Sequence, residues 1–217
     1  MNKKLLAEFI GTFALVFCGT GAIIINQETN GTITHVGIAL TFGLTVMAMI
    51  FAFGKISGAH LNPAVSMALR VSDKIDNKTL LTYTGIQITG AFTASALLKF
   101  LFPTNISLGA TLPAGSDMQS FLLETILAFI LLSVIFFVSE NADEKSVSPA
   151  IAIGATVGLE ALFAGPICGA SMNPARSLAP ALLSGNVEHL WIYLTAPFLG
   201  ALLAVGVYKF IYNGNKE

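Results

Sequence analysis

The chain has 217 residues, of which 54% are hydrophobic and only 11% are charged, and its 11 basic residues nearly balance its 12 acidic ones. A typical soluble domain has about 25% charged residues, so this chain has too few charges to cover a surface that faces water. The net charge of −1 excludes a nucleic-acid binder that works through a basic surface, and the many large apolar side chains exclude a disordered chain, which leaves an integral membrane protein.

Apolar segments of roughly 20 residues, the length that crosses a hydrocarbon core about 30 Å thick, recur along the chain. We expect six membrane-spanning helices, at Leu5–Ile25, Val36–Phe53, Leu80–Phe102, Phe121–Val138, Pro149–Phe163 and Leu190–Tyr212. These segments are too long and too rich in Gly and Ala for the strands of an outer-membrane barrel. A signal peptide is the alternative for the first segment, but bulky Phe17 precedes Cys18 and the apolar residues continue beyond them.

The positions of Lys and Arg predict the orientation, because these residues concentrate near span ends on the cytoplasmic side. Eight of them lie in the N-terminus, the second and fourth connections and the C-terminus: Lys3, Lys4, Lys55, Arg70, Lys74, Lys78, Lys145 and Lys216. The first connection, Asn26–His35, and the third, Pro103–Ser120, contain neither residue type, so both termini should be cytoplasmic. Arg176, in the fifth connection, is the exception. The short loops and the lack of a recognisable signal or transit peptide favour a prokaryotic inner membrane.

Two connections, Gly54–Thr79 and Gly165–His189, are unusually long and contain the same motif, Gly-Ala-x-Leu/Met-Asn-Pro-Ala, at an offset of 111 residues. Other residues repeat at similar offsets, such as Glu8 with Glu124 and Tyr83 with Tyr193. We interpret the chain as a single domain, 1–217, that contains two repeats, 4–102 and 118–212. Each repeat holds three spans, an odd number, so the second copy must cross the membrane in the opposite direction.

In each long connection, an asparagine directly before a proline predicts the start of a helix, because Asn caps the first turn and Pro needs no N–H there. We expect short helices at Pro63–Arg70 and Pro174–Leu183. Each would reach about 15 Å, half of the hydrocarbon core, so two such helices entering from opposite faces would meet with their N-termini at the midplane. One Asn-Pro pair alone would be an ordinary turn. Two pairs at equivalent positions of an inverted repeat indicate a pore, because non-helical backbone at membrane depth is tolerated beside a polar cavity.

The two boxes, Asn62–Ala64 and Asn173–Ala175, resemble those of the aquaporin, or major intrinsic protein, family. The resemblance covers nearly the whole chain, and further matches are Ala7-Glu8-Phe9-x-Gly11-Thr12, Gln87 and Arg176-Ser177. It implies the aquaporin fold, which is an all-α integral membrane fold with six transmembrane helices and two re-entrant half-helices in an inverted repeat. It also implies a homotetramer in the lipid bilayer, with one pore per subunit. Tyr193-Leu194 is similar to the plant nodulin-26-like group.

The resemblance implies a passive channel. Each half-helix N-terminus carries about half an elementary positive charge, so two of them at the midplane would repel protons and other cations. The side-chain amides of Asn62 and Asn173 would donate hydrogen bonds to a passing oxygen and interrupt a chain of proton-conducting waters. Backbone carbonyls would form a ladder of acceptors for the solute, at Gly58, Ala59, His60, Gly169, Ala170 and Ser171.

By the spacing of the family, the selectivity filter consists of Phe42, Ala161, Ala170 and Arg176. Water-selective members typically have a histidine at the position of Ala161, so the two alanines predict a wider ring that admits water and small neutral solutes such as glycerol, urea or metalloid hydroxides. Ser177 favours water selectivity instead, because glycerol facilitators typically have Asp at this position. A strictly water-selective aquaporin is therefore an alternative. A secondary transporter, also built from inverted repeats, and a purely structural junction protein are two others.

No nucleophile–base pair, phosphate-binding loop or metal-ligand cluster is recognised in the sequence, so we expect no enzyme activity, no cofactor and no metal. Glu8, Glu124 and Glu160 could be proton-coupling carboxylates of a transporter, but we favour structural roles. By resemblance, Glu8 and Glu124 would accept hydrogen bonds from the re-entrant loops and brace them. We interpret His60 as bracing its loop rather than as a pH gate, and Cys168 as a thiol accessible from the pore. Six glycines are expected at close helix crossings: Gly85, Gly90, Gly154, Gly158, Gly200 and Gly206.

Overall fold

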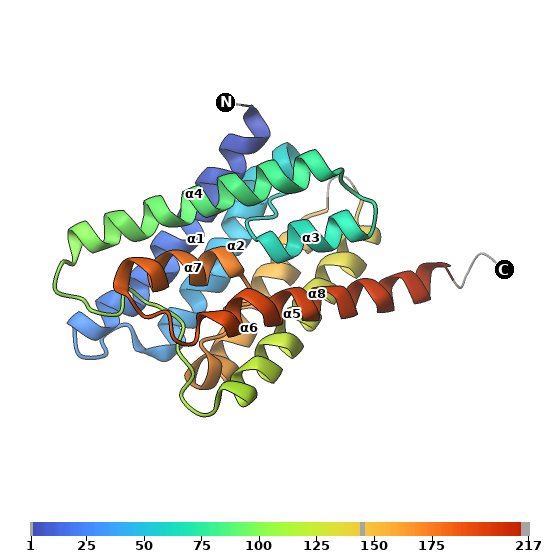
Figure 1. Ribbon diagram of the computed structural model, residues 1–217. Helices are drawn as coiled ribbons and strands as arrows, with labels where there is room; N and C mark the ends of the chain where they lie inside the picture. The colour runs from blue at the N-terminus through green and yellow to red at the C-terminus, as the bar shows by residue number, and fades with distance from the viewer. Residues whose placement is uncertain (1, 144–145, 214–217) are drawn as a thin grey trace.

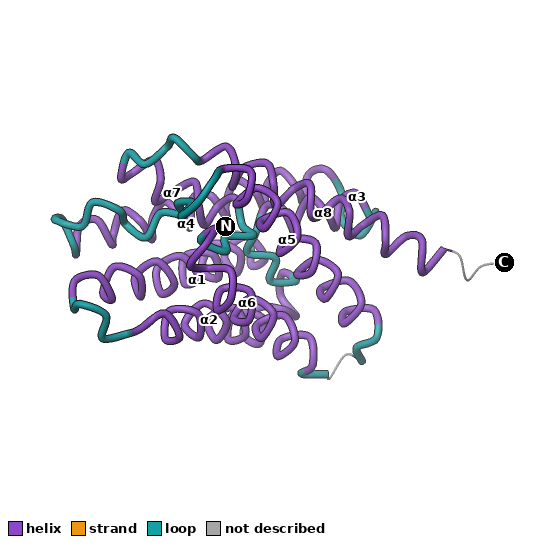
Figure 2. The backbone as a smooth tube through the Cα atoms, turned by 90° about the horizontal axis from the view of Figure 1, so that it is seen from below, coloured by secondary structure: helices purple, strands orange, loops and turns teal. Residues whose placement is uncertain are grey.

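The computed structural model describes residues 2–143 and 146–213, and within these ranges the chain forms helices and loops without a strand (Figure 2). Six helices are long: α1 Lys3–Glu28, α2 Thr34–Ser57, α4 Asn77–Leu101, α5 Asp117–Glu140, α6 Ser148–Cys168 and α8 Leu190–Asn213. Two are short: α3 Pro63–Val71 and α7 Pro174–Ser184. The predicted set of six long helices and two half-helices is therefore confirmed.

Five of the six long helices, α1, α2, α5, α6 and α8, are long and apolar enough to cross a membrane. The exception is α4, which has 25 residues but is rich in threonine. The hydroxyls of Thr82, Thr89 and Thr93 donate to carbonyls four residues earlier in the same helix. These polar groups are thus satisfied within the helix, as a lipid environment requires.

The helices of the two halves pack in matching pairs. Helix α1 packs against α2 and α4, and α5 packs against α6 and α8 in the same way. The halves meet where α2 packs against α6 and where each half-helix contacts both α4 and α8. Figure 1 shows α3 and α7 lying between the longer helices. Matching contacts in two halves, joined by contacts between equivalent elements, are the pattern expected of an inverted repeat.

The crossing of α1 and α4 depends on Gly90. A Cβ atom at this position would lie 2.7 Å from the carbonyl oxygen of Phe9, so the two backbones approach too closely for a side chain. Gly154 meets the backbone of α2 in the same way. At Gly85 and Gly206, in contrast, no atom of another described helix lies within 4 Å of a Cβ position. The prediction that these two glycines mediate close helix crossing is wrong.

Helix α6 is longer than the predicted span Pro149–Phe163, because it continues through Pro166 and ends at Cys168. A proline inside a helix removes the hydrogen bond to the carbonyl four residues earlier, here that of Leu162. Helix α2 replaces this bond, since Nε2 of His35 lies 2.7 Å from the same carbonyl oxygen. Every other helix begins and ends within four residues of its predicted bounds.

Candidate functional site

The two half-helices begin at asparagines that cap them. Oδ1 of Asn62 accepts a hydrogen bond from the N–H of Ala64 at 2.8 Å, and Oδ1 of Asn173 accepts one from the N–H of Ala175 at 3.0 Å. A proline follows each asparagine at the first helical position, where the missing N–H costs no hydrogen bond. The caps fix both side chains at the point where the two half-helices meet.

The amide nitrogens of the same asparagines join the two loops. Nδ2 of Asn62 donates to the carbonyl of Met172, and Nδ2 of Asn173 donates to the carbonyl of Leu61, both at 2.8 Å. An amide nitrogen carries two hydrogens, so each side chain has a second N–H to donate. Both asparagines line a cavity, and within the described chain no second acceptor is bonded to either amide nitrogen.

Glu8 of α1 holds the loop before α3. One carboxylate oxygen accepts from the backbone N–H of His60 at 2.9 Å and from the hydroxyl of Ser57 at 2.7 Å. The other oxygen accepts from the N–H of Leu61 and from Nε2 of Gln87, both at 2.8 Å. The carboxylate is fully buried, and these four donors compensate for its loss of water.

Glu124 of α5 makes the equivalent contacts in the second half. Its two oxygens accept from the backbone N–H groups of Ser171 at 2.7 Å and Met172 at 2.8 Å. Tyr193 supports the end of the preceding helix, because its hydroxyl donates to the carbonyl of Cys168 at 2.8 Å. The two loops are therefore held by matching contacts, which the repeat of Glu8 at Glu124 anticipated.

The loops contain residues with positive φ, a conformation that non-glycine residues rarely adopt. In the first loop φ is +91° at Gly58, +46° at Ala59 and +53° at Leu61, and the equivalent residues of the second loop have +84°, +41° and +52°. The bonds to the buried glutamates stabilise this strained backbone. Within the described ranges, no protein group donates to the carbonyls of the six residues of the predicted ladder, namely Gly58, Ala59, His60, Gly169, Ala170 and Ser171.

The cavity beside these loops has a volume of about 690 Å³. Apolar side chains from the long helices, such as Val46 and Val157, form most of its wall, and the loops contribute the polar groups. All residues of the predicted ladder except Gly169 line it. Of the predicted filter, Phe42 and Arg176 line it together with the ladder residue Ala170, while Ala161 lies in the adjoining buried cluster.

Arg176 lies in the first turn of α7, and the loop between α4 and α5, which carries no motif, holds it. Its Nη1 donates to the carbonyl of Gly109 at 2.8 Å, and its guanidinium carbon lies 5.2 Å from the centre of the Phe42 ring. Thr111 of the same loop donates to the hydroxyl of Ser177 at 2.8 Å. The length of this connection between α4 and α5, together with its lack of Lys and Arg, was the only sequence signal for its role.

Two candidate residues, Cys168 and Glu160, lie away from the cavity. Cys168 is fully buried, with Sγ 3.5 Å from the carbonyl oxygen of Ala164, so the prediction of a pore-accessible thiol is wrong. Glu160 is buried as well, and within the described chain neither of its carboxyl oxygens has a hydrogen-bond partner. It makes no contact of the kind that Glu8 and Glu124 make with the loops.

His60 lines the cavity, and its imidazole ring contacts two neighbouring side chains. Its Nδ1 lies 3.0 Å from the hydroxyl of Ser66, and its ring packs edge-on against Tyr83 with 4.9 Å between the centroids. These contacts, together with its N–H bond to Glu8, agree with the interpretation that His60 braces the loop.

This chain is similar to known proteins in both sequence and structure. The profile of the family described as "Major intrinsic protein" matches residues 1–208. Aquaporin NIP1-1 of Oryza sativa subsp. japonica is 43% identical over 215 residues, which cover 99% of this chain and 76% of the relative. Aquaporin NIP6-1 of Arabidopsis thaliana is 43% identical over 211 residues, covering 97% and 69%. The X-ray structure of the aquaglyceroporin from Plasmodium falciparum has a TM-score of 0.86 and 30% identity, covering 98% of this chain and 97% of that one.

The two curated relatives are plant proteins, so they give no support to the expectation of a prokaryotic inner membrane. They do confirm the resemblance to the aquaporins and to their nodulin-26-like group. The family match extends from the first residue to the last long helix, and the structural match includes both half-helices. The chain therefore belongs to the major intrinsic protein family, and it is a membrane channel rather than an enzyme.

Proposed function

We propose that this channel conducts water together with small uncharged solutes, of which glycerol, urea and metalloid hydroxides are the candidates. The observation that carries the proposal is one cavity that presents both an apolar face and a set of donors and acceptors. A polyol can bond to Arg176 and to loop carbonyls such as that of Ala170 while its carbon skeleton faces Phe42. The name of the structural relative, an aquaglyceroporin, supports glycerol as such a solute.

The proposed filter is Phe42, Ala161, Ala170 and Arg176. We expect this filter to be too wide to select water alone. Each alanine contributes only a methyl group, so two of the four filter positions take up little of the opening. A solute wider than water can pass where a larger side chain, such as histidine, would close the opening.

The exclusion of ions and protons rests on two sources of positive potential. The N-termini of α3 and α7 carry the positive ends of the helix dipoles. Arg176 adds a full positive charge, and it is only 2% exposed, so little water screens it. Asn62 and Asn173 would each donate to the same passing oxygen, which orients that water with its hydrogens outward. A continuous proton wire is thereby interrupted.

The assembly and the orientation also belong to the proposal. Homotetramers are typical of the family, and we expect one pore in each of four subunits. The distribution of Lys and Arg supports cytoplasmic termini. The matching packing of the two halves supports repeats at 4–102 and 118–212. Native mass spectrometry of the detergent-solubilised protein tests the tetramer. Labelling of Lys3→Cys and of Ser107→Cys in sealed cells, each in a Cys18→Ser background, tests the orientation.

Stopped-flow light scattering of proteoliposomes, with osmotic gradients of sucrose, glycerol and urea, tests the solute range. We expect the wild type to pass water and glycerol well above the rate of protein-free vesicles. The variant Ala161→His should keep water permeability and lose glycerol permeability about tenfold or more, because the added ring narrows the opening. Wild-type vesicles that exclude glycerol as strictly as lipid alone would show a water-selective channel. Flux that saturates with solute, or that follows an imposed pH gradient, would show a transporter.

A further inference from the structure

Gly19 of α1 lies directly against the aromatic ring of Phe42. A Cβ atom at Gly19 would lie 2.5 Å from Cζ and 2.6 Å from Cδ1 of that ring, distances that real Cβ atoms essentially never show. Gly19 is buried in the middle of its helix, so this close approach is not a feature of a helix end. The ring occupies the space in which any other residue would place its side chain.

On another side, the Phe42 ring contacts a second residue of the proposed filter. The guanidinium carbon of Arg176 lies 5.2 Å from the ring centre, and both residues line the cavity. The ring is therefore bounded by α1 on one side and by Arg176 over its face. Because Phe42 lines the cavity, a ring that is displaced from α1 can move toward the cavity.

The next residue of α1 supports the other half of the filter. A Cβ atom at Gly109 would lie 2.7 Å from Cβ and 3.0 Å from Cα of Thr20, so the loop between α4 and α5 rests on α1 at this point. The carbonyl of Gly109 accepts the hydrogen bond from Arg176. Two consecutive residues of α1, Gly19 and Thr20, thus support the aromatic and the basic side chain of the filter.

We propose that Gly19 is a positioning residue for solute selection, because its lack of a side chain seats Phe42 against α1 and so sets the width of the filter. This inference rests on the proposed function, since it concerns which solutes pass. Gly19 touches no solute and acts only through Phe42. A methyl group at position 19 would move the ring toward the cavity, and a solute wider than water would be affected first.

Reconstituted wild type and Gly19→Ala, compared by stopped-flow light scattering, test the proposal. We expect Gly19→Ala to lower glycerol permeability about tenfold and water permeability by less than about twofold. Gly21→Ala is the matched control, because Gly21 is buried in the same helix and a Cβ there meets only the flexible Cδ2 of Leu98, at 3.3 Å. Gly85→Ala controls for the higher helix propensity of Ala, since no atom of another described helix lies within 4 Å of a Cβ at that position. Both controls should keep the wild-type ratio of glycerol to water permeability.

A second substitution separates positioning from general packing. In the double variant Gly19→Ala/Phe42→Leu, the smaller side chain leaves room for the added methyl group. Its glycerol permeability should return to within about twofold of the value for Phe42→Leu alone. A general packing defect in α1 would not be corrected by a change in α2.

Three results overturn the inference: an unchanged glycerol-to-water ratio in Gly19→Ala, an equal loss in Gly21→Ala, or a double variant that stays as impermeable to glycerol as Gly19→Ala. If Gly19→Ala is not recovered as a folded protein, the double variant decides, because the clash is with Phe42 and should disappear with it. A double variant that also fails to fold contradicts the proposal.

A wild type that passes water but no glycerol contradicts the proposed solute range and leaves a separate test of Gly19. In that case the water permeability of Gly19→Ala must fall below that of Gly21→Ala and recover in the double variant, and equal water permeabilities overturn the inference.

Discussion

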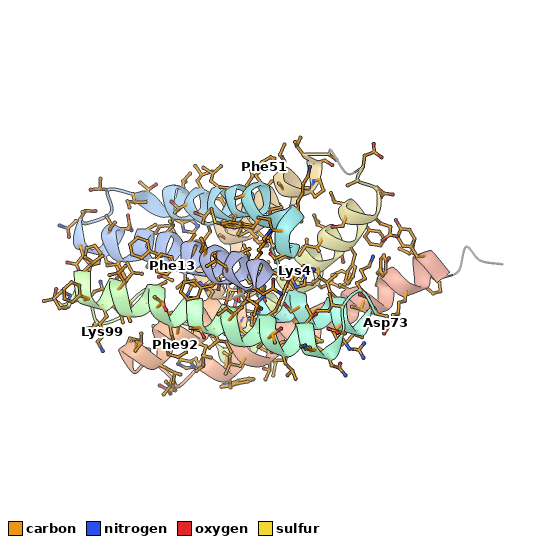
Figure 3. The ribbon with its side chains drawn as sticks, turned by 90° about the horizontal axis from the view of Figure 1, so that it is seen from above. Lys4, Phe13, Phe51, Asp73, Phe92 and Lys99 are labelled. Carbon is orange, nitrogen blue, oxygen red and sulfur yellow. The ribbon has the colours of Figure 1, made fainter. Side chains whose placement is uncertain are left out.

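Lys99 of α4 and Lys209 of α8 make the same contact at two ends of the molecule. Nζ of Lys99 donates to the carbonyl of Leu183 in α7 at 2.7 Å, and Nζ of Lys209 donates to the carbonyl of Val71 in α3 at 2.8 Å. Figure 3 shows Lys99 at the end of the molecule opposite Asp73, which follows α3 closely in the chain. Each lysine thus neutralises the negative end of a half-helix dipole that belongs to the other repeat.

Lys99→Met should lower the free energy of unfolding by about 1 kcal/mol, because the last carbonyls of α7 lose a charged donor. Lys99→Arg should restore most of the loss, since a guanidinium can donate to the same carbonyl. Lys209→Met should have a similar cost, and the double variant should show the sum, because the two contacts share no residue. Thermal unfolding in detergent measures all four variants. Equal stability of Lys99→Met and wild type would show that the contact stabilises nothing.

His35 replaces the helical hydrogen bond that Pro166 removes from Leu162. His35→Leu should destabilise the protein by about 1–2 kcal/mol, because the carbonyl of Leu162 then has no donor. The matched test is Pro166→Ala in the His35→Leu background, since the new backbone N–H can bond to Leu162 within α6. Recovery of the thermal midpoint in this double variant is expected. A midpoint that stays at the value of His35→Leu would mean that His35 acts through another contact.

Glu124→Gln should lower the free energy of unfolding by about 2–3 kcal/mol, because the side-chain amide keeps one acceptor oxygen and turns its NH₂ group toward a backbone N–H. The N–H groups of Ser171 and Met172 cannot then both be satisfied, so the strained loop loses its support. Water permeability per reconstituted channel should fall with the stability. Glu188→Gln is the control, since the side chain of Glu188 is 88% exposed. Wild-type stability and water flux in Glu124→Gln would contradict the bracing role.

Glu160→Gln should leave both the water permeability and its dependence on pH unchanged. Glu160 does not line the cavity, and no described group donates to its carboxyl oxygens, so an amide of the same shape loses no hydrogen bond. Stopped-flow measurements between pH 5.5 and about 8 cover the range in which a proton-coupled transporter would respond. A substantial loss of flux, or flux that becomes independent of an imposed pH gradient only in the variant, would favour the transporter alternative.

The positions of the half-helices could be predicted to within one residue, because an Asn-Pro pair defines a helix start through local chemistry alone. The length of α6 could not. Gly165 and Pro166 are ordinary signals for a helix end, and the donor that allows the helix to continue, His35, lies 127 residues away from Leu162 in the chain. The pairing of Lys99 with Lys209 was not predicted either, although their offset of 110 residues equals that of Tyr83 and Tyr193.

The candidate site also has some features that could be predicted from the sequence and others that could not. The repeat of Glu8 at Glu124 indicated a symmetric role, and the resemblance indicated bracing of the loops. The carbonyl that holds Arg176 was not predictable, because Gly109 belongs to a loop without a motif. The accessibility of Cys168 was predicted wrongly, since the sequence places it beside the pore loop but cannot tell which way its side chain turns.

The membrane environment, the six spans, the inverted repeat and the two capped half-helices could be predicted from the sequence, because hydropathy, the number of spans and helix capping depend on residues that are neighbours in the chain. Three features could be seen only in the folded chain: which carboxylates accept from the N–H groups of the loops, where the cavity lies, and the contact of Phe42 with Gly19. Those outcomes depend on distances between helices that are far apart in the chain. The low share of charged residues, 11%, indicated that most of the surface does not face water. The fold shows which of those charged residues hold the loops and the half-helices in place.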